Sequence, residues 1–366
     1  MTRRFAGLRS TTALATSALA LAGFLTSSPA MAADPIKIGV IAEQSAISGV
    51  AIINSAKLAA DEINEKGGIG GRKIEIIAYD DHSSASDAVR AFQRAVNEDH
   101  VNAVIGSYIS EVVLAMEPWS ARLKMPFITP GAASNDISKK VHDDYDHYKY
   151  TFHEWLTSAF IAQSVCDSSK DTLVDGFHMK TAVVMSEDAA WTKPLDAGYL
   201  DCLPKAGLKV LDHIVFSPDT TDFTPIYSRV ESKAPDVMIL GISHVGVQPT
   251  VQWHSQQVPI AMAGDNAQAT TSTFWKDTNG ATEGVITSTG AAPGSGNTPK
   301  TDPFTDAYTK RFGISPAYSG YATADAVNII GLAVQKAGST DPDKMVTALE
   351  QTDYVGTLGR IQFYGK

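Results

Sequence analysis

Apolar positions follow two alternating periods along most of the chain. Short runs rich in isoleucine and valine, such as residues 35–41 and 102–105, are bounded by polar or glycine positions and predict buried strands. Between such runs the apolar positions recur every three or four residues, as they do from Ile52 to Ile63, which predicts helices with one buried face. Strands that alternate with helices in this way form parallel sheets covered by helices on both faces.

The alternation comes in two runs, separated by residues 139–154, and predicts two lobes of the α/β class. Each lobe is expected to be a doubly wound parallel sheet. The strands expected in the first run are residues 35–41, 73–79, 102–105 and 126–129. Those expected in the second run are residues 181–185, 210–216, 236–240, 259–263 and 284–288, followed by helices over 302–312, 321–337 and 342–351.

The N-terminal segment has a different pattern. Three arginines and no acidic residue among the first nine positions precede an apolar stretch over residues 13–25, and a small-residue motif ends at Ala32. This order is typical of a secretory signal peptide, and the stretch is shorter than the roughly 20 residues of a membrane-spanning helix. We therefore expect residues 1–32 to be a signal peptide cleaved after Ala32. The adjacent Arg3 and Arg4 leave twin-arginine export open as an alternative to ordinary secretion.

Net charge excludes one class of partner. The formal charge is −10 for the whole chain and becomes −13 once the three arginines of the expected signal peptide are removed. Binding to nucleic acid needs clustered lysine and arginine to neutralise phosphates. We therefore expect no nucleic-acid partner.

The two cysteines, Cys166 and Cys202, lie on two successive predicted helices of one lobe. In an oxidising compartment such a pair is a candidate disulfide, and two buried free thiols are the alternative. The sequence leaves both open.

Four segments resemble the branched-chain amino-acid type of periplasmic binding protein, the solute-binding component of ABC transporters. The most specific is a helix that ends in Asn-Glu-Lys-Gly-Gly-Ile at residues 64–69 and is followed by a strand and two aspartates. The other three are residues 104–107 with Ser110 at the next helix start, residues 126–132 and residues 356–363. The four segments occur in the family's order and span nearly the whole chain after the signal segment.

The resemblance implies two lobes joined by three hinge crossings, with a ligand cleft that closes by a hinge motion. The crossings are expected near residues 150–156, 284–289 and 354–359. The first lobe would contain residues 33–152 and 287–355, and the second residues 153–286 and 356–366. Family members usually continue beyond the last hinge strand, so we expect the C-terminal part of the second lobe to be incomplete, with a truncated sequence and a missing final hairpin as open alternatives.

Ligand anchors are expected beyond the carboxyl ends of the strands, where helices begin. Ser110 follows one strand and opens a helix, so its hydroxyl and the nearby N–H groups are candidates for binding a carboxylate, with a plain helix cap as the alternative. Gly131 and Ala132 follow the next strand and offer backbone groups to the same carboxylate, with Ser134 beside them. Ser45, after the first strand, could reach the ligand or merely cap a helix.

Further candidates lie in the second lobe and at the hinge. Trp191 stands where the family usually has a tyrosine and would wall an apolar or aromatic ligand, unless it only packs at a helix start. Asp265 and Asn266 follow a strand and could meet an ammonium or amide, or form a solvated turn. Thr157 lies near the position where amino-acid binders of the family often place an acid.

Two departures from the family's pattern bear on the ligand. Ala133 stands where amino-acid binders often present a hydroxyl, and no acid stands at Thr157, although Glu154 is close. These departures favour a carboxylic acid or amide with no α-ammonium group, aromatic or not. An amino acid stays possible if an acid, Asp265, faces its ammonium in the cleft.

No motif for catalysis or for a cofactor accompanies these residues. The sequence Gly-Ile-Ser-His-Val-Gly at residues 241–246 is one residue too long for the nucleophile elbow Gly-x-Ser-x-Gly, and no phosphate-binding loop occurs. Histidines and acids over residues 142–154 are of metal-ligand types, but a loose tract does not show converging ligands, and a solvated approach to the hinge is the preferred interpretation. We expect no enzyme activity, no cofactor and no metal.

The sequence therefore predicts a periplasmic solute-binding protein that captures a small organic solute and delivers it to an ABC permease in the inner membrane. A monomer suits such a shuttle. The alternative is an extracytoplasmic sensing domain of the same fold that reports to a receptor or regulator.

Overall fold

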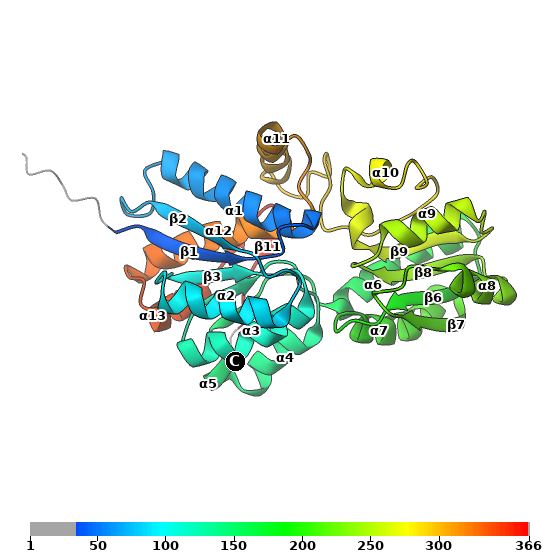
Figure 1. The fold of residues 1–366 in the computed structure, drawn as a ribbon, viewed down its shortest axis with the longest axis horizontal. Coiled ribbons are helices and arrows are strands. Elements are labelled where there is room, and N and C mark those ends of the chain that lie inside the picture. The colour runs from blue at the N-terminus through cyan, green and yellow to red at the C-terminus, as the bar shows by residue number, and fades with distance from the viewer. Residues whose placement is uncertain (1–33, 365–366) are drawn as a thin grey trace, which may run out of the picture. The chain divides into compact units, whose positions relative to one another are not determined.

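Two parallel sheets organise the chain, as the periodicity predicts. The computed structural model describes residues 34–364, so the expected signal peptide lies outside the described residues (Figure 1). The first lobe is built on a sheet with the strand order β2-β1-β3-β4-β5, and the second lobe on a sheet with the order β7-β6-β8-β9. All pairings within these two sheets are parallel. The strands are β1 Ile36–Ile41, β2 Ile74–Tyr79, β3 Ala103–Gly106, β4 Phe127–Thr129, β5 Thr151–His153, β6 Thr181–Glu187, β7 Lys209–Phe216, β8 Val237–Ile242 and β9 Ala261–Asn266.

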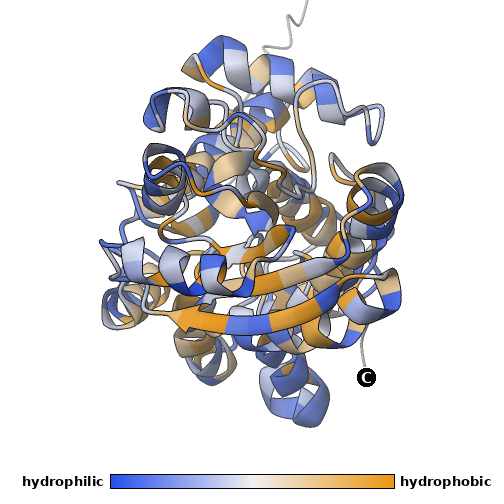
Figure 2. Ribbon diagram, turned by 90° about the vertical axis from the view of Figure 1, so that its right-hand side faces the viewer, coloured by the Kyte–Doolittle hydropathy of each residue, from blue (hydrophilic) through white to orange (hydrophobic). Residues whose placement is uncertain are grey.

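Helices cover both faces of each sheet, and hydrophobic residues concentrate on the strands and on the helix faces turned toward them (Figure 2). In the first lobe these helices are α1 Ile47–Glu65, α2 Ala85–Asn97, α3 Ser110–Leu123, α4 Asn135–Asp143, α5 Tyr145–Tyr148, α11 Thr301–Phe312, α12 Tyr318–Ala337 and α13 Pro342–Leu349. In the second lobe they are α6 Ser158–Ser169, α7 Thr192–Ala206, α8 Thr224–Lys233, α9 Val247–Ser255 and α10 Phe274–Asp277, with a π-helical turn over Lys170–Gly176 and a 3-10 turn over Ala267–Thr270.

Alternate residues of one strand enter the two cores of a lobe. On β3, Ile105 packs with α1, α12 and α13, whereas Val104 packs with α2 and α3 on the other face. The sheet is therefore buried on both sides, which is why its strands are nearly continuous apolar runs in the sequence. Because both faces are packed, each strand is held in position along the sheet. The residues that follow its carboxyl end are therefore held in position too.

The chain crosses between the lobes twice within the described residues. It leaves the first sheet after β5 and enters the second lobe at α6, whose Ile161 and Ala162 are buried in that lobe's core. It returns after residues 285–288, which run beside β9. The predicted strand over residues 284–288 is reduced to one bridge. The N–H groups of Ile286 and Ser288 still donate to carbonyls of β9, and the hydroxyl of Thr287 bonds both the N–H and the carbonyl of Asn266.

The C-terminal segment differs from the predicted boundary. Strands β10 (Tyr354–Val355) and β11 (Arg360–Ile361) form an antiparallel hairpin that packs on the first lobe, so residues 356–364 do not cross into the second. The N–H and hydroxyl of Thr357 bond the carboxylate of Asp325 on α12, and the ring of Phe363 lies 5.0 Å from that of Phe152. These contacts satisfy a buried carboxylate and cover apolar surface, which holds the segment on the first lobe.

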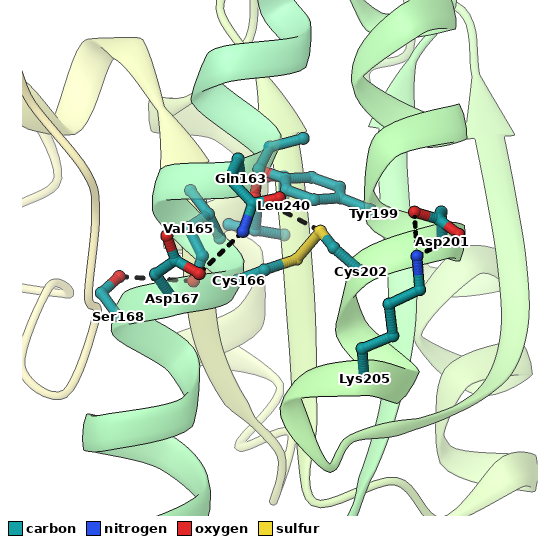
Figure 3. The surroundings of a disulfide bond; sticks show 11 residues. Gln163, Val165, Cys166, Asp167, Ser168, Tyr199, Asp201, Cys202, Lys205 and Leu240 are labelled. Atoms are coloured by element: carbon teal, nitrogen blue, oxygen red, sulfur yellow. Dashed lines mark hydrogen bonds and ion pairs between the residues drawn. A yellow bond between two sulfur atoms is a disulfide. The ribbon is translucent and has the colours of Figure 1, made fainter.

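A disulfide joins the two central helices on one face of the second lobe. Cys166 on α6 and Cys202 on α7 are bonded, so the structure favours the disulfide over two free thiols (Figure 3). Closing a loop between residues 36 apart in sequence is worth about 4 kcal/mol of stability by loss of unfolded-state entropy. Between residues 34 and 364, no helix combines the length and the apolar character that crossing a membrane takes.

Candidate functional site

A cleft opens where residues that follow the strands of both sheets meet. It encloses about 730 Å³ of empty space, including its open mouth. The first lobe contributes residues that follow β3 and β4, the second lobe residues that follow β6, β8 and β9, and the crossings contribute Trp155, Leu156 and residues 288–290. Carboxyl ends of parallel strands are where ligands bind in doubly wound folds.

Ser110 lines the cleft at the start of α3. The helix cap is Ile109, which has no side-chain cap, so Ser110 is the first helical residue and not the capping serine that the alternative interpretation requires. Its hydroxyl oxygen accepts hydrogen bonds from the N–H groups of Ala133 (3.3 Å) and Ser134 (3.1 Å). Because both bonds use the oxygen as acceptor, the hydroxyl hydrogen is left to donate to a ligand, beside the positive end of the helix.

The loop after β4 divides into residues that face the cleft and residues that lie behind it. Gly131 lines the cleft, and a Cβ there would come within 2.8 Å of the Cβ of Tyr108, so this close approach requires glycine. Ala132 does not line it: its carbonyl accepts from Nε2 of His153. Ser134 does not either, because its hydroxyl caps α4.

Aromatic rings form much of the wall. Trp191 lines the cleft, and its indole N–H donates to Glu187 Oε1 at 2.9 Å, which fixes the ring. Trp155 and Tyr318 also line it, with ring centroids 4.7 Å apart. Sequence reasoning missed these two, although Trp155 is the second residue after a strand, where a cleft residue is expected.

Asp265 is the acidic residue of the cleft. It lies near the end of β9, and its Oδ2 accepts a hydrogen bond from the hydroxyl of Ser288 at 2.9 Å. Burial raises the pKa of Asp265 to about 7, and the hydrogen bond from Ser288 only partly opposes this. No lysine or arginine lines the cleft among residues 34–364, so the structure gives this carboxylate no strong cation as a partner.

His244 is a functional candidate that sequence reasoning missed. It follows β8, lines the cleft, and has a side chain that is 27 % exposed. Its Nδ1 lies 2.7 Å from Oε1 of the fully buried Glu187. The one sequence feature that marked it was its position after a predicted strand, within the Gly-Ile-Ser-His-Val-Gly segment that does not fit the nucleophile elbow.

Glu187 and His244 shift each other's pKa. Burial opposes ionisation of Glu187, but bonds from His244 Nδ1 and from the backbone N–H groups of Ser243 and His244 outweigh it and lower its pKa. Burial likewise opposes protonation of His244, but Glu187, with help from Glu111 and Glu43, raises its pKa. Each group of the pair therefore favours the charged form of the other.

Like Ala132 and Ser134, three further predicted site residues lie outside the cleft. Asn266 is buried behind it, where its side chain caps the 3-10 turn. Ser45 is exposed and donates to Glu43 at 2.6 Å. Thr157 is at the N-cap position of α6, next to Leu156, which does line the cleft. Glu154 does not line it either: its carboxyl is buried, and burial and then the charge of Asp325 raise its pKa well above the usual range.

The two lobes touch across the cleft. The carboxylate of Glu111 on α3 accepts from the backbone N–H of Ala190 in the second lobe at 2.5 Å. The N–H of Ser315, before α12, donates to the hydroxyl of Ser272 in the second lobe at 3.2 Å. Both contacts therefore join the first lobe to the second.

Comparison with known proteins identifies similar chains over nearly the whole length. Residues 35–366 match the family model described as periplasmic binding protein. A Leu/Ile/Val-binding protein of Rhizobium johnstonii is 25% identical over 338 residues, which cover 90% of this chain and 87% of the relative.

Two solved structures show the same fold. The substrate-binding protein of a branched-chain amino acid transporter from Streptococcus pneumoniae, in complex with isoleucine, has a TM-score of 0.77 at 20% identity and covers 90% of this chain and 91% of its own. A solute-binding protein of an ABC transporter from Rhodopseudomonas palustris, in complex with 3,4-dihydroxybenzoic acid, has a TM-score of 0.76 at 22% identity. The match covers 90% of this chain and 88% of that protein.

Proposed function

Because the chain belongs to the periplasmic binding protein family, of the branched-chain amino-acid ABC transporter type, we propose that it binds an α-amino acid with an apolar side chain and delivers it to an ABC importer. The family acts in the periplasm by binding solutes. The importer role and the choice of ligand are the parts proposed here.

The observation that carries the choice of ligand is the uncompensated carboxyl of Asp265. It lines the cleft with a pKa of about 7, and within residues 34–364 its carboxylate accepts one side-chain hydrogen bond, from Ser288. A buried carboxylate gains most from a cation that comes with it into the low-dielectric site. A ligand ammonium supplies that cation.

The other groups of the cleft match the rest of an amino acid. In the first lobe, the free hydroxyl hydrogen of Ser110 and the start of α3 suit a carboxylate. Trp155, Trp191 and Ile161 offer apolar walls to a side chain. A zwitterion thus meets an anion-binding group on one lobe and an acid on the other, and it stabilises the closed form by contacting both.

The names of similar proteins agree with this assignment. The relative from Rhizobium johnstonii is named for binding leucine, isoleucine and valine, and the structure from Streptococcus pneumoniae holds isoleucine. The structure from Rhodopseudomonas palustris holds an aromatic acid with no ammonium, so the discriminating group is the ammonium.

A matched ligand series tests the proposal. The chain without residues 1–32 is unfolded, refolded to remove carried-over ligand, and melted with L-leucine, with 4-methylpentanoate, which lacks the ammonium, and with isoamylamine, which lacks the carboxylate. L-phenylalanine, 3-phenylpropanoate and 2-phenylethylamine form the second series. A ligand at 100 times its Kd adds about 2.7 kcal/mol of stability. We expect the amino acids alone to shift the melting temperature strongly.

The pH dependence separates the two ligand classes. An ammonium needs ionised Asp265, so amino-acid affinity should fall as the pH drops below about 7. An acid without an ammonium needs protonated Asp265, so its affinity should fall as the pH rises above about 7. Binding of the acids alone, with the second profile, would refute the amino-acid assignment.

A further inference from the structure

We propose that His244 is a second anchor for the ligand carboxylate, and that its Nε2–H faces Ser110 across the closed cleft. This inference rests on the proposed function, since it assigns a further residue to the same site. The ligand carboxylate would then be bound by groups of both lobes, and not by the first lobe alone.

The hydrogen bonds of Glu187 decide which nitrogen of His244 is available. The carboxylate accepts from Trp191 Nε1, from His244 Nδ1 and from two backbone N–H groups, those of Ser243 and His244. An ionised carboxylate can only accept, so Nδ1 must carry a hydrogen. Nε2 is then the nitrogen left for the cleft, and no protein group in residues 34–364 bonds it.

The charges around His244 keep its imidazole able to donate. Glu187 faces it from the end of β6, Glu111 from α3, and Glu43 from the loop after β1. All three are acids, and Asp265 is the acid that lines the cleft within residues 34–364. With Nδ1 donating to Glu187, protonation at Nε2 makes His244 the one basic side chain that lines the cleft within the described residues.

The topology places the two anchors at the same edge of the second sheet. His244 follows β8 and Asp265 lies near the end of β9, and these strands are neighbours in the sheet, with Gly241 paired to Asp265. Both side chains line the cleft at the carboxyl ends of these strands, where ligands bind in doubly wound folds. The ammonium of an α-amino acid would meet Asp265, and its carboxylate would meet His244.

The opposite lobe brings Ser110 to the same end of the site. The next residue, Glu111, accepts from the N–H of Ala190 in the second lobe, and its charge is among those that raise the pKa of His244. Ser110 and His244 both line the cleft, so the two lobes present them to the same ligand. The carboxylate would receive a hydroxyl hydrogen from one lobe and an imidazolium hydrogen from the other.

Isothermal titration calorimetry on the refolded chain with L-leucine and L-phenylalanine tests this anchor. H244Q retains a polar side chain but removes the positive charge, and H254Q makes the same change at an exposed histidine of the same lobe. Loss of a charged hydrogen bond should weaken amino-acid binding about ten- to a hundredfold in H244Q. H254Q should bind as the wild-type chain does, and the matched amines, which lack a carboxylate, should bind H244Q and wild type equally.

The pH profile separates an anchor from a structural role. Wild-type affinity should fall as the pH rises through the raised pKa of His244, and this fall should be absent in H244Q. E187Q keeps the shape of the pair but removes the charge that supports the imidazolium, so its affinity should fall at a lower pH than that of the wild type. Equal loss of amine and amino-acid binding in H244Q would show that His244 only shapes the cleft, which overturns the anchor.

The remaining outcomes separate the two proposals. If amino acids bind and H244Q has wild-type affinity and pH profile, the anchor is wrong and the amino-acid assignment stands. If 4-methylpentanoate binds and leucine does not, the amino-acid assignment is wrong. A lower affinity of H244Q for 4-methylpentanoate would then still support the anchor. If no amino acid or acid binds the wild-type chain, both are overturned.

Discussion

Replacing Asp265 by asparagine should stabilise the empty protein at neutral and alkaline pH while it removes affinity for amino acids. Burial raises the pKa of Asp265 to about 7 in the folded chain, against about 3.9 in an unfolded one. A group whose pKa is raised on folding contributes stability that is present at low pH and lost as the pH rises through the folded-state value. Asparagine carries no charge at any pH, so the variant escapes this loss.

The magnitude follows from the size of the pKa shift. A shift of about three units corresponds to about 4 kcal/mol, and this is an upper limit because water in the mouth of the cleft screens the charge. For a folded part of about 330 residues, this free energy raises the melting temperature by no more than about 6 °C. The gain should be nearly absent at about pH 4, grow between about pH 4 and pH 7, and level off above about pH 8.

Thermal melts of the ligand-free wild-type chain and D265N across this pH range measure the effect. D219N is the matched control, because Asp219 is an exposed acid of the same lobe. Calorimetry with L-leucine on the same samples measures binding, which D265N should lose. A stability difference that is constant with pH, or that D219N shares, would show that burial does not hold back ionisation of Asp265, and the argument for an ammonium site would fail.

Other substitutions test the remaining contacts. S110A should lower the affinity for amino acids, measured by calorimetry, about tenfold. The affinity for the matched amines should not change, since only the ligand carboxylate loses a donor. C166S should lower the free energy of unfolding by about 4 kcal/mol in urea titrations, and reductant should lower that of the wild type but not of the variant. T357V removes a hydroxyl donor from Asp325 and should cost about 1–3 kcal/mol, seen as earlier proteolysis of the C-terminal hairpin. G131A should push Tyr108 away and weaken binding, whereas G313A, at an exposed helix end, should not.

The strands were largely predictable because both faces of each sheet are buried. Strand β8 was expected at residues 236–240 and spans Val237–Ile242, since a continuous apolar run has few other places in a soluble fold. The C-terminal hairpin was not predictable. Its position depends on Thr357 meeting Asp325 and on Phe363 meeting Phe152, and these contacts join residues far apart in the sequence.

Individual site residues could be predicted from the sequence only where the strand order alone places them at the cleft. Ser110 opens the helix after β3 and Asp265 lies near the end of β9, so topology places them at the cleft. The role of His244 depends on Glu187, 57 residues away, which fixes its tautomer and charge. Tyr318 comes from the start of α12, which the family resemblance assigned to the first lobe but which no local pattern marked as a source of cleft residues.

The ligand assignment shows why single positions can mislead. The absence of a hydroxyl at Ala133 and of an acid at Thr157 favours a ligand without an ammonium only if those positions must supply the anchors. In the structure the hydroxyl of Ser110 bonds the backbone at Ala133, and Asp265 supplies an acid from a different strand. With Glu187 and His244 balanced against each other, Asp265 is the one ionisable group of the described cleft whose charge the protein leaves unmatched. The proton on that carboxyl therefore decides whether the cleft prefers a zwitterion or an acid, and pH is the variable that separates them.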